Sequence, residues 1–124
     1  MLVRFGLWCE KILKNLKMKY SEKWDRAYDV RNRDGLSELV DKDFHFIRHS
    51  TGEKVPRERI LDMWTTKDRV VIRSQRVVYE SDEILVQNWF MDWPNGTKDA
   101  VLTVMLLKNG KATKMELAST PLPQ

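Results

Sequence analysis

Apolar side chains follow two different periods along this chain, and the change falls near residue 68. Before that point they recur every three or four positions, as on one face of a helix. Beyond it they alternate with polar side chains, as on one face of a strand. Helices first and strands afterwards are typical of an α+β domain whose helices pack on one face of a sheet. At 124 residues, without an internal repeat, the chain is expected to form one such domain.

Three helices are expected in the first half of the chain. The first begins at Ser21, a favourable N-cap residue, and carries Trp24 and Tyr28 along one side. A short second helix is expected over residues 36–40, after a break at 32–35. The third helix includes Pro56, whose fixed φ angle suits the first turn.

Five strands are expected, one between the helices and four after them. The last two are joined by Asn109-Gly110, a strong signal for a two-residue hairpin turn. The sheet is therefore expected to be mostly antiparallel, with four or five strands. The predicted strand ranges are 43–49, 70–79, 84–92, 97–107 and 111–119.

The predicted strand at 97–107 is apolar on both of its faces. An antiparallel sheet commonly leaves one face to water, so a strand of this kind needs cover on its second face. We expect Val101, Met105 and Leu107 to need that cover. The N-terminal segment or a second copy of the chain would supply it, and an isologous homodimer is the simpler arrangement.

Residues 1–19 form a separate basic segment, in which five basic residues and one acidic residue account for the whole net charge of +4. Their apolar spacing predicts a basic amphipathic helix, which would pack on its own domain, pack on a partner subunit, or contact an anionic membrane surface. Met18 would also be a natural start for the compact domain. The rest of the chain is electrically balanced and has no basic stripe, so nucleic-acid binding is not expected.

The cysteine content and the absence of targeting signals favour a cytoplasmic protein. The single cysteine, Cys9, cannot form an intrachain disulfide, which indicates a reducing compartment. No apolar run approaches the length of a membrane-spanning helix, and no signal-peptide pattern opens the sequence. The sequence has no glycine-rich phosphate loop, metal-binding cluster or nucleophile elbow, so neither a cofactor nor a metal is expected.

Ionisable side chains gather at the end of the first predicted strand, where Arg48 and His49 precede a turn at Gly52. A neutral imidazole suits proton abstraction at physiological pH, so His49 is the first candidate for a catalytic acid or base; a hydrogen-bonded structural histidine is the alternative. Arg48 is a candidate to hold an anionic substrate group, or to pair with a carboxylate such as Glu53. Five tryptophans indicate either a large aromatic core or a flat ligand slot. The candidate pocket residues are Trp24, Tyr28, Phe46, Trp64 and Trp89.

Several short phrases occur in an order that is similar to a known family. They are Trp24…Tyr28…Asn32-Arg-Asp-Gly-Leu36, Phe44-His-Phe, His49-Ser-Thr-Gly52, Tyr79-Glu-Ser-Asp82, Asn109-Gly-Lys111 and Met115-Glu116. Over residues 20–120 the chain resembles the SnoaL-like branch of the nuclear-transport-factor-2-like superfamily, the cystatin-like cones. Residues 1–19 would then be an extension and residues 121–124 a tail. The resemblance implies a conical domain whose curved sheet and helices enclose an apolar cavity.

The resemblance also implies where chemistry would occur. In ketosteroid-isomerase-like members a carboxylate base lies near the end of the first strand, and the matching place here holds Arg48 or His49. Those members use a tyrosine of the first helix as a hydrogen-bond donor; the matching position holds Trp24, and Tyr28 lies one turn further on.

Two functions follow. The first is a cofactor-independent isomerase, cyclase or dehydratase that moves a proton on a small apolar substrate. The alternative is a ligand-binding or dimerisation module without turnover.

Overall fold

The computed structural model describes residues 18–66 and 70–123, and it confirms an α+β architecture. Three helices pack against one face of a six-stranded sheet: α2 (Tyr20–Asp29), α3 (Arg33–Glu38) and α4 (Arg57–Thr65). The strands are β1 (Val40–Arg48), β2 (Lys54–Pro56), β3 (Val71–Glu80), β4 (Ile84–Asp92), β5 (Lys98–Lys108) and β6 (Lys111–Pro121). The predicted amphipathic helix falls on residues 1–17, which lie outside the described residues.

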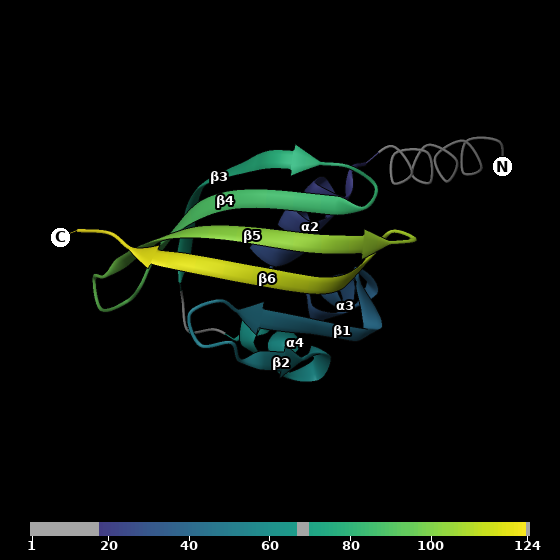
Figure 1. Cartoon of the computed structure of the whole chain (residues 1–124), viewed down its shortest axis with the longest axis horizontal. Coiled ribbons are helices and arrows are strands. Elements are labelled where there is room, and N and C mark those ends of the chain that lie inside the picture. The colour runs from purple at the N-terminus through teal and green to yellow at the C-terminus, as the bar shows by residue number, and fades with distance from the viewer. Residues whose placement is uncertain (1–17, 67–69, 124) are drawn as a thin grey trace, which may run out of the picture.

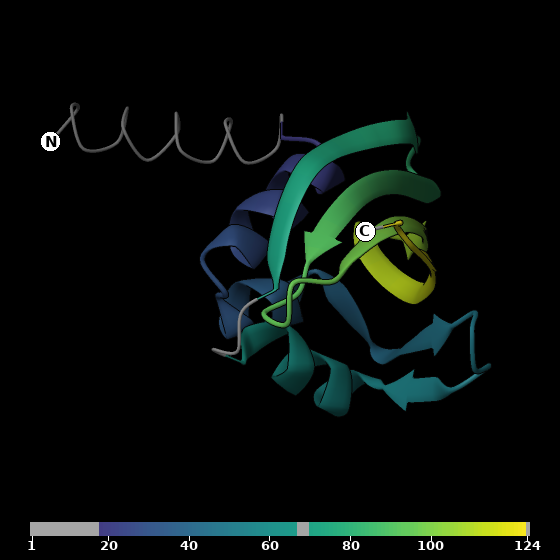
Figure 2. The ribbon, with the colours of Figure 1, turned by 90° about the vertical axis from the view of Figure 1, so that its left-hand side faces the viewer.

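The sheet is strongly curved and stays open, with the strand order β2-β1-β6-β5-β4-β3 (Figures 1 and 2). Strands β3 to β6 form the predicted antiparallel meander. Among the described strands, β1 and β6 are the one parallel pair, with Phe46 opposite Met115. The short strand β2 was not predicted; it pairs antiparallel with β1, and Val55 lies opposite Phe46.

The first helix begins two residues earlier than predicted, and a distant carboxylate satisfies its N-terminus. Lys19 is the N-cap and makes no side-chain cap bond. The backbone N–H and the hydroxyl of Ser21 donate instead to the two carboxylate oxygens of Glu80, at 3.0 and 2.7 Å. The prediction of Ser21 as N-cap is therefore wrong, and the contact fastens α2 to the end of β3. A carboxylate at this position is also favourable to the helix dipole.

The short second helix lies earlier in the chain than predicted. The side-chain oxygen of Asn32 accepts a hydrogen bond from the Gly35 backbone N–H at 3.1 Å, which caps α3 at its start. The helix then ends at Glu38, and Val40 already belongs to β1.

An aromatic cluster joins α2, α4 and β1. The Trp64 ring meets the Trp24 ring edge-on, with 5.0 Å between the ring centroids. Trp64 also contacts Phe44 and Phe46 of β1, at 5.8 and 6.5 Å. All four side chains are buried. Because large aromatic rings dominate the apolar area that a small domain buries, this cluster is a main source of its stability.

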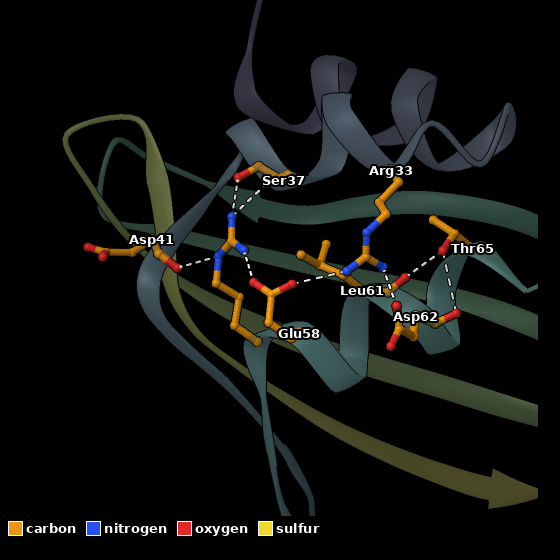
Figure 3. A network of polar contacts seen from close by, with 8 residues as sticks. Arg33, Ser37, Asp41, Glu58, Leu61, Asp62 and Thr65 are labelled. Carbon is orange, nitrogen blue, oxygen red and sulfur yellow. Dashed lines mark hydrogen bonds and ion pairs between the residues drawn. The ribbon is translucent and has the colours of Figure 1, made fainter.

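Two arginines attach α4 to the elements before it (Figure 3). The Arg57 guanidinium donates to the Ser37 carbonyl and hydroxyl oxygens at 3.0 and 2.7 Å, and to the Asp41 carbonyl at 3.1 Å. It also forms an ion pair with Glu58. Arg33 of α3 bridges Glu58 and Asp62 of α4, at 3.0 and 2.5 Å. These contacts fix the position of α4 relative to the start of β1.

Strand β5 is apolar on both faces as predicted, but the face that lacks cover is the opposite one. Val101, Met105 and Leu107 are buried beneath the helices. Leu102 and Leu106 are 45% and 37% exposed on the other side, which we call the outer face. In Figure 1 no described helix lies over this face of β3 to β6. The expectation that Val101, Met105 and Leu107 need cover was therefore wrong, because a strand that is apolar on both faces gives no periodic signal to choose between them.

No helix among the described residues has the length and apolar character that a lipid bilayer requires.

Candidate functional site: a cavity between helices and sheet

A cavity of about 340 Å³ lies between the helices and the inner face of the sheet. Its wall combines side chains of α2 and α4 with side chains of β1, β3, β4 and β6. This size and largely apolar character are typical of sites for small molecules. The apolar and aromatic residues of the wall are Trp24, Tyr28, Phe46, Ile60, Met63, Trp64, Val70, Ile72, Trp89, Met91, Trp93, Met115 and Leu117.

Six of the seven residues predicted to form a site line this cavity, namely Trp24, Tyr28, Phe46, Arg48, Trp64 and Trp89. Strand alternation explains the pair from β1, because Phe46 and Arg48 are two positions apart and share the inner face. Whether these side chains contact a ligand stays a prediction.

His49 does not line the cavity. Its ring lies on the outer face of the sheet, where Nε2 donates to Glu116 Oε1 at 3.2 Å. The side chain is 51% exposed. This hydrogen bond from His49 holds the pKa of the Glu116 carboxyl below its ordinary value, with a smaller contribution from Lys114. The hypothesis that His49 stands at the mouth of the cavity was wrong. His49 directly follows β1, and its backbone N–H still donates to the Leu117 carbonyl at 2.9 Å, so the alternation of the strand carries its side chain to the face opposite that of Arg48.

Two titratable side chains are found among the described residues of the wall, Tyr28 and Arg48. Neither acts as a general base at neutral pH, since a guanidinium cannot be deprotonated in proteins and a phenol acts first as a donor. The buried Arg48 Nε has no hydrogen-bond partner within the described chain, and the carboxylate of Glu53 lies 3.7 Å from it. The Arg31 guanidinium covers the Tyr28 ring, 4.2 Å from its centroid.

A hydrogen-bonded group of polar side chains stands behind the apolar wall. Gln75 lines the cavity, and its amide nitrogen donates to Asp25 Oδ1 at 2.9 Å. The same oxygen accepts from the amide nitrogen of buried Gln87 at 3.2 Å. Burial raises the pKa of Asp25 above its ordinary value, the Gln87 bond opposes this rise, and the nearby carboxylates of Asp29 and Glu80 add to it.

Three further polar atoms are buried on β4 and β5. The Trp89 indole N–H, the Gln87 side-chain carbonyl and the Thr103 hydroxyl have no hydrogen-bond partner within residues 18–66 and 70–123. Gln87 and Thr103 lie directly opposite each other on β4 and β5. Unpartnered buried polar groups are uncommon in folded proteins, and each one requires a physical explanation, such as a catalytic role or a bound water or ion.

In the part of the chain that the structure describes, no three histidine, cysteine or acidic side chains come together as metal ligands.

Comparison with known proteins identifies the fold of the chain. No protein-family model matches the sequence, and no curated protein matches it.

Solved structures match across most of the chain. A protein of Burkholderia xenovorans LB400, described as an NTF-2 like protein of unknown function, is 15% identical over 85% of both chains, with a TM-score of 0.67. A "putative ketosteroid isomerase" of Kribbella flavida DSM 17836 is 9% identical over 85% of this chain and 78% of its own, with a TM-score of 0.72. An NTF2-like protein of unknown function from Cytophaga hutchinsonii ATCC 33406 is 14% identical over 82% and 87%, with a TM-score of 0.64.

The chain has the nuclear-transport-factor-2-like fold. The predicted superfamily resemblance is confirmed at the level of that fold. The three structures do not separate its branches, so the SnoaL-like assignment stays a prediction.

Within this nuclear-transport-factor-2-like domain, sequence reasoning missed Asp25, Gln75 and Gln87. Asp25 follows Trp24 on an otherwise polar part of α2, and nothing in its local pattern distinguishes it from a solvated helix residue. A glutamine in an apolar strand, as Gln87 is in β4, is the one signal that was available, because a buried amide requires partners.

Proposed function

We propose that this protein binds a small, largely apolar molecule in the cavity and does not turn it over. One observation carries the proposal: four tryptophans and other apolar side chains form most of the wall, while no carboxylate or imidazole is found among its described residues. The tryptophans are Trp24, Trp64, Trp89 and Trp93. Such a wall suits the removal of apolar surface from water, which contributes roughly 25 cal/mol per Å².

The absence of a base from the described wall is what favours binding over proton transfer. General acid–base catalysis requires an acceptor within hydrogen-bond reach of the proton that moves, directly or through one water. His49 lies on the other face of the sheet and does not meet this condition. We propose that Arg48 and Tyr28 act as ligand contacts, since both offer polar atoms at the edge of an apolar wall.

A proton-transfer enzyme is the second candidate, and Asp25 is the observation in its favour. It is a half-buried carboxylate with a raised pKa, which is a common property of catalytic acids and bases. Gln75 stands between Asp25 and the cavity, so this role requires the Gln75 side chain to move aside. The Kribbella flavida protein named above supports this candidate by its description alone.

We further propose a homodimer formed through the outer face. Ile84 and Val86 of β4 lie beside Leu106 and Val104 of β5, which makes a continuous apolar area. Exposed Leu102 extends it. A second copy of the chain would cover this area by twofold symmetry. The single cysteine also supports the proposal that the protein works in the cytoplasm.

A pair of tryptophan substitutions tests cavity binding. Ser119 borders the cavity, whereas Thr120, the next residue of β6, is exposed and does not. Titration calorimetry with naphthol as the probe should show binding by the wild type and by Thr120→Trp. It should show strongly reduced binding by Ser119→Trp, because the new indole occupies the edge of the cavity. Equal binding by both variants would overturn the proposal.

A second measurement separates binding from turnover. Acetonaphthone carries exchangeable protons next to its carbonyl, and their replacement by deuterium in D2O can be followed by NMR. The protein should not accelerate this exchange beyond buffer. Acceleration by the wild type that Asp25→Asn abolishes would favour the enzyme.

A further inference from the structure

An irregularity in β3 places Gln75 on the cavity wall. Arg73 lies opposite Phe90 and Arg76 lies opposite Asn88, so two residues of β3, Ser74 and Gln75, face the single residue Trp89 of β4. This is a β-bulge, which re-aims the side chains on one strand. Ser74 takes up the distortion with a φ angle of 55°, in the left-handed region that residues other than glycine seldom adopt.

The bulge has a consequence for the inner face. Without the extra residue, strand alternation would place Ile72 and Gln75 on opposite faces, since they are three positions apart. Both line the cavity. The distortion therefore brings a carboxamide to the wall, across the ladder from Trp89.

Asp25 determines which end of that carboxamide is offered to a ligand. The carboxylate accepts hydrogen bonds and cannot donate them, so the nitrogen of Gln75 must face Asp25, at 2.9 Å. The carbonyl oxygen of Gln75 is then the end available as an acceptor. Asp25 is held in turn by Gln87 at 3.2 Å.

Trp89 supplies the complementary donor. It lines the cavity, is 6% exposed, and its indole N–H has no partner among the residues that the structure describes. Leaving such a donor without an acceptor is costly, by roughly the desolvation penalty of the group.

We propose that the Gln75 carbonyl and the Trp89 N–H together recognise a hydroxyl group, and that the ligand is therefore an apolar alcohol or phenol. This inference rests on the proposed binding function and names its ligand class. A hydroxyl satisfies both groups at once, because it accepts from the indole and donates to the carboxamide. A ketone would leave the Gln75 carbonyl without a donor. A carboxylate would bring a second negative charge close to Asp25.

Arg48, the one cationic side chain among the described residues of the wall, does not change the expected ligand class. The carboxylate of Glu53 lies 3.7 Å from Arg48 Nε and offsets its charge. Glu53 also pairs with Arg59, at 3.3 Å.

The test uses three probes that share one bicyclic ring and differ in one group: naphthol, methylnaphthalene and naphthoate. Calorimetry on the full chain should show naphthol bound about tenfold to a hundredfold more tightly than methylnaphthalene. Gln75→Leu and Trp89→Phe should each remove most of that preference and leave methylnaphthalene binding within a few-fold of the wild type. Far-UV circular dichroism and urea unfolding establish that each variant is folded.

The role of Asp25 as a positioning residue has its own readout. Asp25→Ala frees the Gln75 amide to rotate and should reduce the preference for naphthol. Asp25→Asn retains an oxygen that accepts from Gln75 and should restore most of the preference. If the role of Asp25 were merely structural, Asp25→Ala would bind naphthol and methylnaphthalene equally less tightly.

The outcomes separate this inference from the proposed function. Equal affinity for naphthol and methylnaphthalene, both sensitive to Ser119→Trp, would overturn the hydroxyl inference and leave cavity binding intact. If naphthoate binds most tightly and Arg48→Gln loses that affinity, the ligand is an anion and the hydroxyl inference is overturned. Binding of none of the three probes would overturn both.

Discussion

Arg48 and His49 are neighbours in sequence, yet their side chains lie on opposite faces of β1. The Arg48 side chain lines the cavity. The His49 ring bonds to Glu116 on the outer face. One peptide unit thus separates a residue that a ligand would meet from a residue that solvent meets. This arrangement has a direct experimental consequence.

His49→Gln should leave binding of the naphthol probe unchanged within about twofold, because no described part of the ring borders the cavity. Loss of the exposed pair with Glu116 should lower the free energy of unfolding by less than about 1 kcal/mol. Calorimetry and urea unfolding measure the two effects, with Ser119→Trp as the variant that does lose binding. A large loss of affinity in His49→Gln would contradict the cavity as the binding site.

The pH dependence of stability should differ between the wild type and Asp25→Asn. Burial raises the pKa of Asp25 above its ordinary value of 3.8, and Asp29 and Glu80 add to the shift while Gln87 opposes it. The folded state therefore holds the Asp25 proton more tightly than the unfolded chain does. Stability must then fall as the pH rises from 3.8 through the folded pKa, and remain constant with respect to this group above it.

Asp25→Asn keeps an acceptor for both glutamine amides but does not titrate. The wild type should thus lose stability relative to this variant as the pH rises through that window. Urea unfolding of both proteins at a series of pH values measures the difference. Parallel profiles would show that the carboxyl is not perturbed by burial.

Arg57→Ala should lower the free energy of unfolding by about 1–3 kcal/mol, because it leaves the carbonyls of Ser37 and Asp41 without their donor. Arg59→Ala on the same helix is the matched control. Its side chain is mostly exposed and pairs with Glu53, so its removal should change stability by less than about 1 kcal/mol. Urea unfolding compares them, and equal effects would mean that the contacts of Arg57 add nothing beyond a surface charge.

Leu102→Glu should convert the proposed dimer to a monomer, since it places a charge on the exposed apolar outer face. Val30→Glu is the control, because Val30 is 70% exposed at the end of α2 and away from the sheet. Sedimentation of the wild type and both variants at micromolar concentration measures the assembly state. A wild type that sediments as a monomer would remove the outer face as a dimer interface.

The sequence predicts the antiparallel meander well because its signals are local. The observed range of β4, Ile84–Asp92, is the predicted one. Alternation fixes which side chains share a face, and the turn at Asn109-Gly110 fixes where the chain reverses. Helical periodicity likewise places Trp24 and Tyr28 on one side of α2, since they are one helical turn apart.

The features that local periodicity does not specify are those set by distant contacts. Strand β2 is three residues long and exists through its pairing with β1, which no window of sequence contains. The bulge at Ser74 depends on how two strands meet, and Gln75 reaches the wall through it. The role of Asp25 depends in turn on Gln75 and Gln87. The hydrogen-bonded group of Asp25, Gln75 and Gln87 was therefore identified from the structure and not from the sequence.

The parallel pairing of β1 with β6 also has a consequence for synthesis on the ribosome. Phe46 and Arg48 form one part of the cavity wall, and Met115, Leu117 and Ser119 on the adjacent strand form another. The first part is translated well before the second, and the ladder between them closes a long loop. A nascent chain that ends before residue 111 has the three described helices and strands β1 to β5 but lacks β6 and the part of the wall that β6 supplies. Ligand capture is thus expected only once translation is nearly finished, so a ligand would stabilise the completed protein rather than guide its early folding.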